Sequence, residues 1–398
     1  MPHSLSDREL YRYAPVLIGT TRFAPLPVTK NILITGGAGF IASWLVRHLT
    51  LQYADSYRIV SFDKLDYCAS LNNTAILDQC PNFTFVQGDV TKQSDVSAVL
   101  KKYDIDTIIH FAAQSHVDLS FGNSLQFTAT NVWGTHVLLE CARIHGKIKR
   151  FLHVSTDEVY GEVKDDEARV ESSILAPSNP YAASKAAAEM LVHSYWKSYK
   201  LPIIMVRGNN VYGPHQYPEK IIPKFTLLLT RSLPLPLHGT GHHSRHYLYA
   251  SDATNAFDTL LHLGVPGEIY NIGSRDETTN TQLCVLLLRE FSIDGTKEDV
   301  FCRWVRHTRD RVFNDRRYAV DSRKLEELGW RPEVGLGEGL RRTVEWYRRW
   351  GERWWGDVGG VLVAHPEVVG GKEGTGTVEV GVDDDGEVRL SVDGGLER

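Results

Sequence analysis

Residues 32–43 read ILITGGAGFIAS, and this stretch decides the fold that the sequence predicts. The run ILIT indicates a buried strand, and the residues after the turn have the apolar spacing of an amphipathic helix. Between them, Gly36, Gly39 and Ala42 have a G-x-x-G-x-x-A spacing. Small residues let the backbone approach a pyrophosphate, which then lies at the helix N-terminus. A glycine-rich turn can also be a simple tight connection, but its place between strand and helix favours a dinucleotide-binding turn.

The same alternation continues outward from this turn, from Lys30 to Arg207. Short apolar runs such as YRIVSFD, IDTIIHFAA and LPIIMVRG alternate with helical segments, which is typical of a parallel sheet covered on both faces. We therefore predict an α/β fold, with a Rossmann-type doubly wound parallel sheet and a smaller C-terminal α/β substrate-binding lobe. Beyond Arg207 the chain is rich in Pro, Gly and His, as expected of loops that surround a ligand.

The changes in amino-acid composition and in the strand and helix pattern along the chain predict its domain boundaries. They are an N-terminal extension at 1–29, a dinucleotide-binding Rossmann domain at 30–208 to which 247–273 returns, a substrate-binding lobe at 209–246 and 274–350, and an acidic glycine-rich tail at 351–398. In the tail, TVEVGVDDDGEVRLSV alternates valines with polar residues around Asp-Gly, so it predicts either an isolated hairpin or disorder.

Composition excludes several classes of protein. The 398 residues carry a formal net charge of −5, which does not suggest a nucleic-acid binder. The five cysteines have irregular spacing, so free thiols are expected rather than a disulfide scaffold or a zinc site. The N-terminus does not have the pattern of a secretory signal, and no apolar run approaches the roughly 20 residues of a membrane span. We expect a cytoplasmic protein without a membrane or nucleic-acid partner, and no metal.

Asp63 ends the second predicted strand, about 24 residues after Gly39. An acid near this offset binds the ribose diol of a dinucleotide and repels a 2′-phosphate, so NAD is favoured over NADP. Lys64 follows directly, and a base there could tolerate a phosphate.

Tyr181 and Lys185 in NPYAASK are four residues apart at the start of a predicted helix, and therefore lie on one face. A free phenol has a pKa near 10, and a neighbouring ammonium lowers it. A single Y-x-x-x-K motif is weak evidence, since it can be a packed Tyr and a solvated Lys. Together with the glycine turn and Asp63 it indicates an oxidoreductase-type site.

Two adjacent carboxylates, Asp157 and Glu158, follow the strand in RFLHVSTDEVYG, residues 150–161. Acids in this position are most often solvated loop residues, but near the two motifs above they are candidates for acid and base catalysis. Side chains of consecutive extended residues point to opposite sides, so the backbone has to turn within TDEVYG for both to reach one ligand. One of two crowded carboxyls keeps its proton more readily, although the sequence does not show which one.

TGGAGFIAS, STDEVYG and YAASK resemble the extended short-chain dehydrogenase/reductases. Within them, the chain from about Lys30 to Trp350 is similar to the nucleotide-sugar 4,6-dehydratases. FAAQ, FND and NVYGP look most like the UDP-glucose 4,6-dehydratases of plants and fungi, which lead to UDP-rhamnose. Such a lyase takes hydride from C4 of the sugar onto NAD, eliminates water across C5 and C6, and returns hydride to C6. The resemblance implies bound NAD, a nucleotide-sugar substrate and a homodimer.

The resemblance also implies roles for individual residues. It assigns catalysis to Thr156, Asp157, Glu158, Tyr181 and Lys185, with Asp157 as acid and Glu158 as base. It assigns the cofactor site to Gly36, Gly39, Phe40, Ile41, Asp63, Lys64, Leu65, Asp66, Asp89, Val90, Phe111, Ala112, Ala113, Thr130, Tyr181 and Lys185. It assigns the substrate site to Ser115, Thr156, Asn210, Lys220, Ile221, His238, Arg245, Asn280, Arg311 and Asn314.

UDP-glucose is the expected substrate, and dTDP-glucose is the alternative. A nucleotide-sugar 4-epimerase or decarboxylase would share Tyr181 and Lys185 but has no evident use for both acids. A catalytically silent NAD-binding regulator would be expected to have lost part of this set, and all of it is present.

Overall fold

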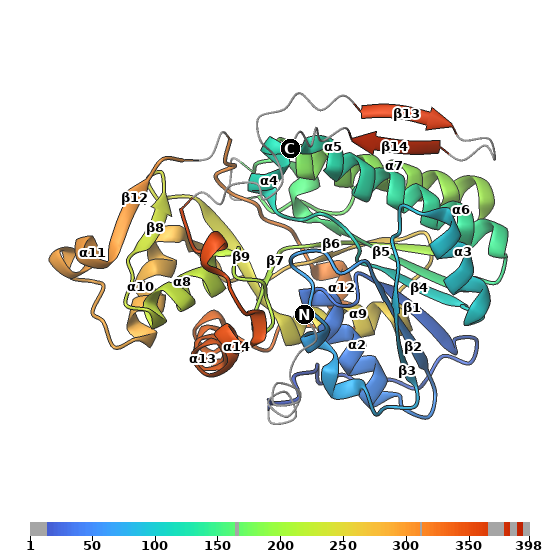
Figure 1. Cartoon of the computed structure of the whole chain (residues 1–398), viewed down its shortest axis with the longest axis horizontal. Coiled ribbons are helices and arrows are strands. Elements are labelled where there is room, and N and C mark those ends of the chain that lie inside the picture. The colour runs from blue at the N-terminus through green and yellow to red at the C-terminus, as the bar shows by residue number, and fades with distance from the viewer. Residues whose placement is uncertain (1–13, 164–166, 311–312, 365–377, 383–387, 393–398) are drawn as a thin grey trace, which may run out of the picture. The chain divides into compact units, whose positions relative to one another are not determined.

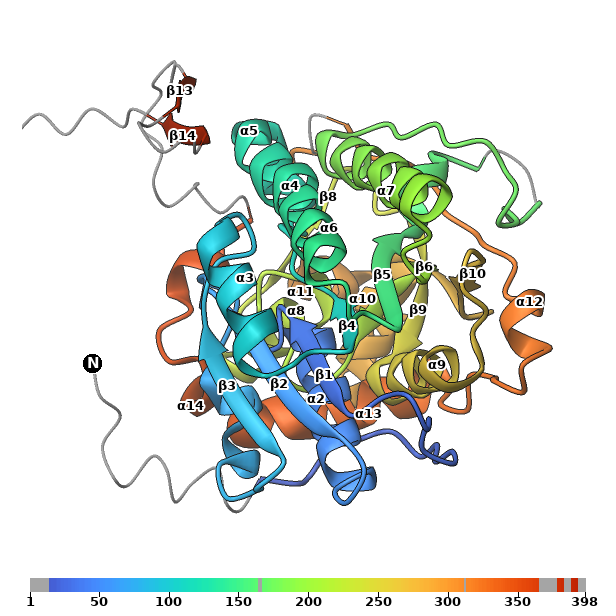
Figure 2. The same cartoon turned by 90° about the vertical axis from the view of Figure 1, so that its right-hand side faces the viewer.

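The predicted alternation of strands and helices forms a parallel sheet in the computed structural model, which describes residues 14–163, 167–310, 313–364, 378–382 and 388–392. Among these residues, one sheet has the strand order β10-β6-β5-β4-β1-β2-β3, and all its neighbouring strands are parallel (Figure 2). The strands are β1 Asn31–Thr35, β2 Arg58–Asp63, β3 Phe83–Gln87, β4 Thr107–His110, β5 Arg150–Thr156, β6 Ile203–Gly208 and β10 Ile269–Ile272. The chain changes direction across the sheet between β1 and β4, where ligands of doubly wound sheets bind. The predicted fold class is confirmed.

Helices cover both faces of this sheet because successive strand side chains point to opposite sides. Ile32 and Ile34 of β1 pack in one apolar cluster with residues of α2 and α9. Leu33 packs in the other, with residues of α3, α6 and α7. Figure 1 shows the two helical layers above and below the sheet. The helices and short turns of this part are α2 Phe40–Gln52, η1 Leu71–Asn73, η2 Ala75–Leu77, α3 Gln93–Lys102, α4 Val117–Gly122, α5 Ser124–Phe127, η3 Thr128–Trp133, α6 Gly134–His145, η4 Asp157–Tyr160, α7 Pro180–Tyr199, α9 Ala250–Leu263 and α12 Arg323–Glu326.

A smaller group of strands and helices follows β6. Among the described residues, its sheets have the orders β11-β9-β7 and β12-β8. A third apolar cluster, which includes Phe225, Leu287 and Leu340, joins α8, α10 and α13 to these strands. The elements are β7 Asn210–Tyr212, α8 Ile221–Thr230, β8 Leu235–His238, β9 Ser244–Tyr249, β11 Glu277–Thr279, α10 Asn280–Glu290, α11 Glu298–Trp304, β12 Val305–Thr308, α13 Leu336–Trp346 and η5 Tyr347–Gly351.

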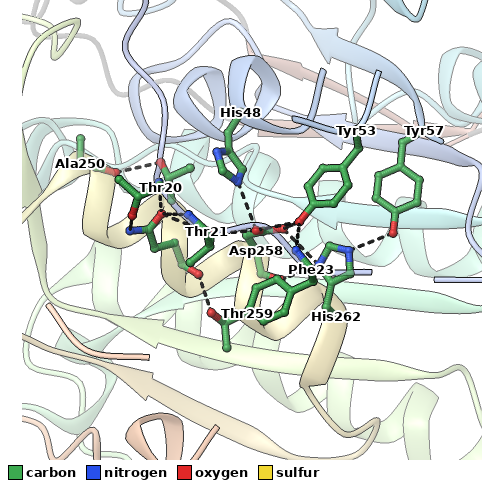
Figure 3. Close-up of polar contacts among 12 residues, drawn as sticks. Thr20, Thr21, Phe23, His48, Tyr53, Tyr57, Ala250, Asp258, Thr259 and His262 are labelled. Atoms are coloured by element: carbon green, nitrogen blue, oxygen red, sulfur yellow. Dashed lines mark hydrogen bonds and ion pairs between the residues drawn. The ribbon is translucent and has the colours of Figure 1, made fainter. Parts of the chain in front are cut away.

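The chain is also ordered at both ends of this body. Residues 14–29 run beneath the sheet, where Thr21 and Phe23 contact a buried polar cluster around Asp258 on α9 (Figure 3). After η5, the chain continues through α14 Glu352–Trp355 and η6 Gly359–Val361, and Trp354 and Leu362 are buried. Part of the segment predicted as a tail is therefore packed. The predicted domain boundaries stay a prediction.

The described residues after Ala364 belong to a second unit of the chain. Within it, β13 Val378–Val382 pairs antiparallel with β14 Val388–Val392, which is the hairpin that the valine alternation allows.

Candidate active site

A cavity of about 440 Å³ lies at the carboxyl ends of β1, β2, β4, β5 and β6. Residues of the smaller lobe form its other wall. All the predicted site residues line it except three. Leu65 and Asp157 are not among the lining residues, and Arg311 lies outside the described residues. The tertiary structure therefore brings together side chains that are as much as about 280 positions apart in the chain.

The glycine turn forms one end of this cavity. Gly36 has a φ of +71°, and a Cβ there would lie 2.8 Å from the backbone nitrogen of Ala112, so a side chain would fill the turn. Helix α2 begins directly after Gly39. Within the described structure, no side chain caps this helix and no acid lies in its first turn. The first N–H groups of a helix have no partner within it and attract anions. The turn therefore fits the pyrophosphate of a dinucleotide.

Asp63, the last residue of β2, holds the same turn in place. Its carboxylate accepts hydrogen bonds from the backbone nitrogens of Ala38 at 3.0 Å and Leu65 at 2.8 Å. Burial raises the pKa of Asp63, and these two hydrogen bonds oppose the rise. Its remaining lone pairs lie at the cavity, where they could accept from a ribose diol.

Lys64 could have accommodated a 2′-phosphate, but its ammonium is paired with Asp66. Its Nζ lies 2.9 Å from Asp66 Oδ2, and Gln114 Nε2 donates to the same oxygen at 2.6 Å. An ammonium that is already paired is a weaker partner for an added phosphate. This arrangement favours NAD, as predicted from Asp63.

The backbone turns directly after β5, as the two carboxylates require. Glu158 lines the cavity, and its Oε2 accepts from Asn179 Nδ2 at 3.0 Å. Asp157 is only 3% exposed. Its Oδ2 accepts from Asn209 Nδ2 at 2.6 Å, and its Oδ1 lies 3.2 Å from the Oγ1 of Thr156, which does line the cavity. The two acids thus face different surroundings.

Burial raises the pKa of Asp157 to about 7, and the neighbouring Glu158 charge adds to the rise. Hydrogen bonds from Asn209 and Thr156 and the charge of Arg245 act in the opposite direction. Near neutral pH, Asp157 therefore holds a proton in a large fraction of molecules. That is the property required of a general acid.

Tyr181 and Lys185 both lie in the first turns of α7 and line the cavity. Burial and the Glu158 charge raise the pKa of Tyr181, although a Thr156 hydrogen bond lowers it. The pKa of Tyr181 thus moves opposite to the lowering expected from Lys185, because removing a phenol from water disfavours its ionised form. Burial also lowers the pKa of Lys185 to about 8, and its Nζ donates to the backbone oxygen of Val154 at 2.7 Å.

The smaller lobe supplies cationic side chains. Lys220 Nζ donates to the backbone oxygen of Ser115 at 2.8 Å, which joins the two walls of the cavity. Arg245 donates to Asn314 Oδ1 at 3.2 Å, and its guanidinium lies 4.7 Å from the ring centroid of Tyr318. These side chains suit a diphosphate, since Arg offers a planar fork and Lys a point charge.

The C-terminal end of the body reaches this wall as well. His238 Nε2 donates to the backbone oxygen of Ala364 at 2.8 Å, and Lys224 Nζ donates to that of Val363 at 3.0 Å. Ala364 itself lines the cavity. We call residues 357–364 the C-terminal strap.

Sequence reasoning missed the polar residues that hold the two acids. The resemblance implies a substrate contact by Asn210 but not by its neighbour Asn209, and it implies no role for Asn179. Tyr318, whose hydroxyl contacts Asp315 and lies 3.5 Å from Glu158 Oε2, carries no local signal at all. A polar residue directly after a parallel strand, such as Asn209, is the kind of signal that could have been used.

The chain is similar to enzymes that act on nucleotide sugars. The model of the family described as GDP-mannose 4,6 dehydratase matches residues 33–343. A trifunctional UDP-glucose 4,6-dehydratase/UDP-4-keto-6-deoxy-D-glucose 3,5-epimerase/UDP-4-keto-L-rhamnose-reductase of Arabidopsis thaliana is 50% identical over 343 residues, which are 85% of this chain and 50% of the relative. The chain thus spans about half the length of such plant relatives. A dTDP-D-glucose 4,6-dehydratase of Bos taurus is 47% identical over 333 residues, 83% of this chain and 92% of the relative.

A solved structure shows the same similarity. The dTDP-glucose 4,6-dehydratase DesIV of Streptomyces venezuelae, with NAD and TYD bound, matches with a TM-score of 0.77 and 41% identity. The match covers 82% of this chain and 99% of that one. A UDP-glucose 4-epimerase of Thermotoga maritima, solved with UDP-glucose, matches with a TM-score of 0.72 and 31% identity, over 80% of this chain and 99% of the other. In the part of our chain that the structure describes, no helix has both the length and the apolar character needed to cross a bilayer.

Proposed function

The chain belongs to the family described as GDP-mannose 4,6 dehydratase, and from this premise we propose that it converts UDP-glucose to UDP-4-keto-6-deoxyglucose and water. The observation that carries the proposal is the pair of carboxyls beside Tyr181 and Lys185. Glu158 lines the cavity, and the buried Asp157 has a pKa raised to about 7. Oxidation at C4 needs only the Tyr and Lys, whereas elimination needs an additional acid and base.

The cofactor that we propose is NAD. When bound, it would accept hydride from C4 and return it to C6. Gly36, Gly39 and the N-terminus of α2 would hold its pyrophosphate, and Asp63 would accept hydrogen bonds from a ribose diol. The carboxylate of Asp63 and the pairing of Lys64 with Asp66 support the non-phosphorylated cofactor.

The residues of the chain would move three protons. Tyr181, as the phenolate, would take the proton of the 4-hydroxyl, with Thr156 hydrogen-bonded to its phenol. The ammonium of Lys185 and the positive nicotinamide of bound NAD would favour this ionised form against the burial that disfavours it. The 4-keto group then acidifies C5–H. Glu158 takes the C5 proton and Asp157 gives a proton to the C6 hydroxyl. The C6–O bond breaks, water leaves, and a C5–C6 double bond forms. After reduction at C6, Glu158 returns a proton to C5.

Uridine is favoured over thymidine by the stretches FAAQ, FND and NVYGP, and by the 50% identity to the plant relatives. Arg245, Lys220 and Asn314 would contact the diphosphate and Asn280 the base. The bovine relative at 47% identity keeps dTDP-glucose as the second candidate substrate.

The test is turnover in deuterated water. We expect purified protein with NAD and UDP-glucose to give a 4-keto-6-deoxy sugar with deuterium at C5, and to turn over dTDP-glucose more slowly. A 4-epimer without deuterium at C5, or no product, would overturn the proposal. Asp157→Asn and Glu158→Gln should each lower turnover by roughly 10²–10⁴-fold.

We also propose that the protein is a cytoplasmic homodimer. All five cysteines are unpaired in the structure, which suits a reducing compartment. Ile144 on α6 and Met190 and Tyr199 on α7 are each more than half exposed, so these helices present apolar side chains that a second copy could cover. Light scattering coupled to size-exclusion chromatography would measure the mass in solution, and a monomer would contradict the dimer.

A further inference from the structure

The Asp157 carboxyl is held by an amide that can point in only one direction. Asn209 Oδ1 accepts a hydrogen bond from the backbone nitrogen of Ser274 at 3.1 Å. A backbone N–H can only donate, so the oxygen of this amide has to face Ser274. The amide nitrogen therefore faces Asp157 and donates to its Oδ2 at 2.6 Å. The direction of the hydrogen bond follows from the network itself.

The rest of the structure fixes Asn209 in this position. Its backbone nitrogen donates to the oxygen of Ile272, the last residue of β10, at 2.9 Å. Its side chain lies against Gly273, where a Cβ would come within 2.8 Å of Asn209 Oδ1. Asn209 is 7% exposed, so little water competes for these bonds. The amide thus has a fixed donor end and a fixed acceptor end.

This orientation decides which oxygen of Asp157 carries the acidic proton. Oδ2 receives the N–H of Asn209, and a proton on Oδ2 would compete with that donor. Oδ1 is the other oxygen, and it accepts from the Thr156 hydroxyl at 3.2 Å. A hydroxyl can turn and accept a proton from Oδ1, whereas the amide N–H of Asn209 can only donate. Thr156 and Asn209 both line the cavity, whereas Asp157 does not, and of the two only Thr156 hydrogen-bonds the phenol of Tyr181, which is proposed to act on the sugar. A proton on Oδ1 therefore lies on the side from which the sugar can be reached.

We propose that Asn209 is a positioning residue that places the transferable proton of Asp157 on Oδ1, beside Thr156. The inference rests on the proposed function, in which Asp157 gives this proton to the departing C6 hydroxyl. Without the Asn209 donor, the proton is distributed over both oxygens, and on Oδ2 it faces position 209 rather than Thr156 and Tyr181.

The carboxyl of Glu158 is also held by an asparagine that a backbone N–H orients, which supports the inference. Asn179 Oδ1 accepts from the backbone nitrogen of Ala182 at 2.9 Å, so its Nδ2 has to face Glu158. In both cases a backbone N–H orients an asparagine, and the asparagine engages one oxygen of a carboxyl. In each carboxyl, the oxygen that does not face the asparagine is the one that we infer carries or takes the proton.

The variants are Asn209→Leu, which is similar in size and has no donor, and Asn209→Asp, which can still accept from Ser274 but cannot donate when ionised. Asn82→Leu is the control, because Asn82 donates to backbone oxygens of Thr50 and Tyr57 and does not line the cavity.

Oxidation at C4 does not use Asp157, so we expect it to continue in all variants. Elimination should slow by roughly 10²-fold in both Asn209 variants, as expected for a misplaced reacting group.

The first readout is absorbance of reduced nicotinamide after mixing holoenzyme with UDP-glucose. We expect it to accumulate in the Asn209 variants, with kcat lowered and KM nearly unchanged, and not in the Asn82 variant. The alkaline limb of the rate profile should also move to higher pH, since the Asn209 hydrogen bond lowers the pKa of Asp157. The titratable groups that face Asp157, namely Glu158, Arg245 and Tyr181, are unchanged in these variants. Only Asn209→Asp adds a charge beside Asp157, so the shift of the alkaline limb is read in Asn209→Leu.

The second readout is difference infrared spectroscopy of the protein without substrate. The carbonyl stretch of protonated Asp157 is identified by its loss in Asp157→Asn. In Asn209→Leu this band should move to higher frequency, because its carbonyl oxygen loses an N–H donor, whereas Asn82→Leu should leave it in place. An unmoved band, or slowed oxidation together with slowed elimination, would overturn the positioning role. If the wild type forms no 4-keto-6-deoxy sugar, the proposed function fails separately, and the band still decides where the proton lies.

Discussion

Asp157 and Glu158 are consecutive residues, yet Glu158 lines the cavity while Asp157 is 3% exposed and accepts a hydrogen bond from Asn209. The turn η4 after β5 separates their surroundings. The more buried carboxyl is the one whose pKa rises to about 7. This difference in burial is what makes Asp157 the acid in the proposed mechanism.

The raised pKa of Asp157 predicts a cost in stability. Below the unfolded value near 4, both states hold the proton and nothing is lost. As the pH rises toward the folded value of about 7, the unfolded chain ionises first, and unfolding becomes easier by about 1.4 kcal/mol per pH unit. Asp157→Asn removes this loss. Relative to the wild type, we expect the variant to gain unfolding free energy between about pH 4 and about pH 8 in urea titrations.

Other buried carboxyls, such as Asp63 and Asp252, also have raised pKa values. They are present in both proteins, so their effect cancels in the difference. A difference in unfolding free energy that stays constant over this pH range would contradict the burial argument for Asp157.

The pair of Lys64 and Asp66 predicts a change in cofactor selectivity. Asp66→Asn removes the carboxylate 2.9 Å from Lys64 Nζ and leaves an amide that cannot neutralise it. We expect the affinity for NADP relative to NAD to rise about tenfold, the equivalent of about 1.4 kcal/mol. Isothermal titration of cofactor-free protein measures both affinities. Asp294→Asn, at an exposed ion pair with Lys297, is the control and should leave the ratio unchanged.

The buried cluster under the sheet predicts a role for residues 14–29 in stability. Asp258 accepts from Thr21 Oγ1 at 2.7 Å and from Tyr53 at 3.0 Å, and lies 3.1 Å from both His48 and His262 (Figure 3). Burial alone would raise the pKa of Asp258, but its partners hold it at about 2. Its stabilising contribution is therefore present above the unfolded value near 4 and is lost as the pH falls toward 2.

We expect Asp258→Asn to lower the unfolding free energy by about 3–5 kcal/mol, the typical cost of breaking a buried charge network. The milder Thr21→Val should cost about 1 kcal/mol. Both should speed proteolytic cleavage within residues 14–29, measured by mass spectrometry. Cleavage at the wild-type rate in both variants would show that the cluster does not anchor this segment.

The C-terminal strap predicts an effect of truncation on ligand affinity. Val363 and Ala364 place backbone oxygens against Lys224 and His238, two donors beside the cavity. A chain that ends after Gly356 loses these bonds, and we expect UDP to bind it about tenfold more tightly by titration calorimetry. A chain that ends after Ala364 keeps the strap and is the matched control. Equal or weaker binding by the shorter chain would mean that the strap supports the site rather than competing for it.

Some features of this protein could be predicted from the sequence because local spacing determines them. Gly36 and Gly39 lie between an apolar run and a helical pattern, and the turn they form is the one expected. The four-residue spacing of Tyr181 and Lys185 places both in the first turns of α7, facing the cavity. The alternation of strands and helices specified the parallel sheet, since each buried strand requires a covering helix on either side.

Only the tertiary structure decided how the two acids differ. Asp157 and Asn209 are 52 residues apart, and their 2.6 Å hydrogen bond exists because β5 and β6 are neighbours in the sheet. The rise in the pKa of Tyr181, opposite to the direction expected from Lys185, likewise follows from burial. Sequence spacing determines which side chains share one face of one element. Burial and contacts between distant strands depend on the packing of the whole chain, and they decide which carboxyl holds the proton.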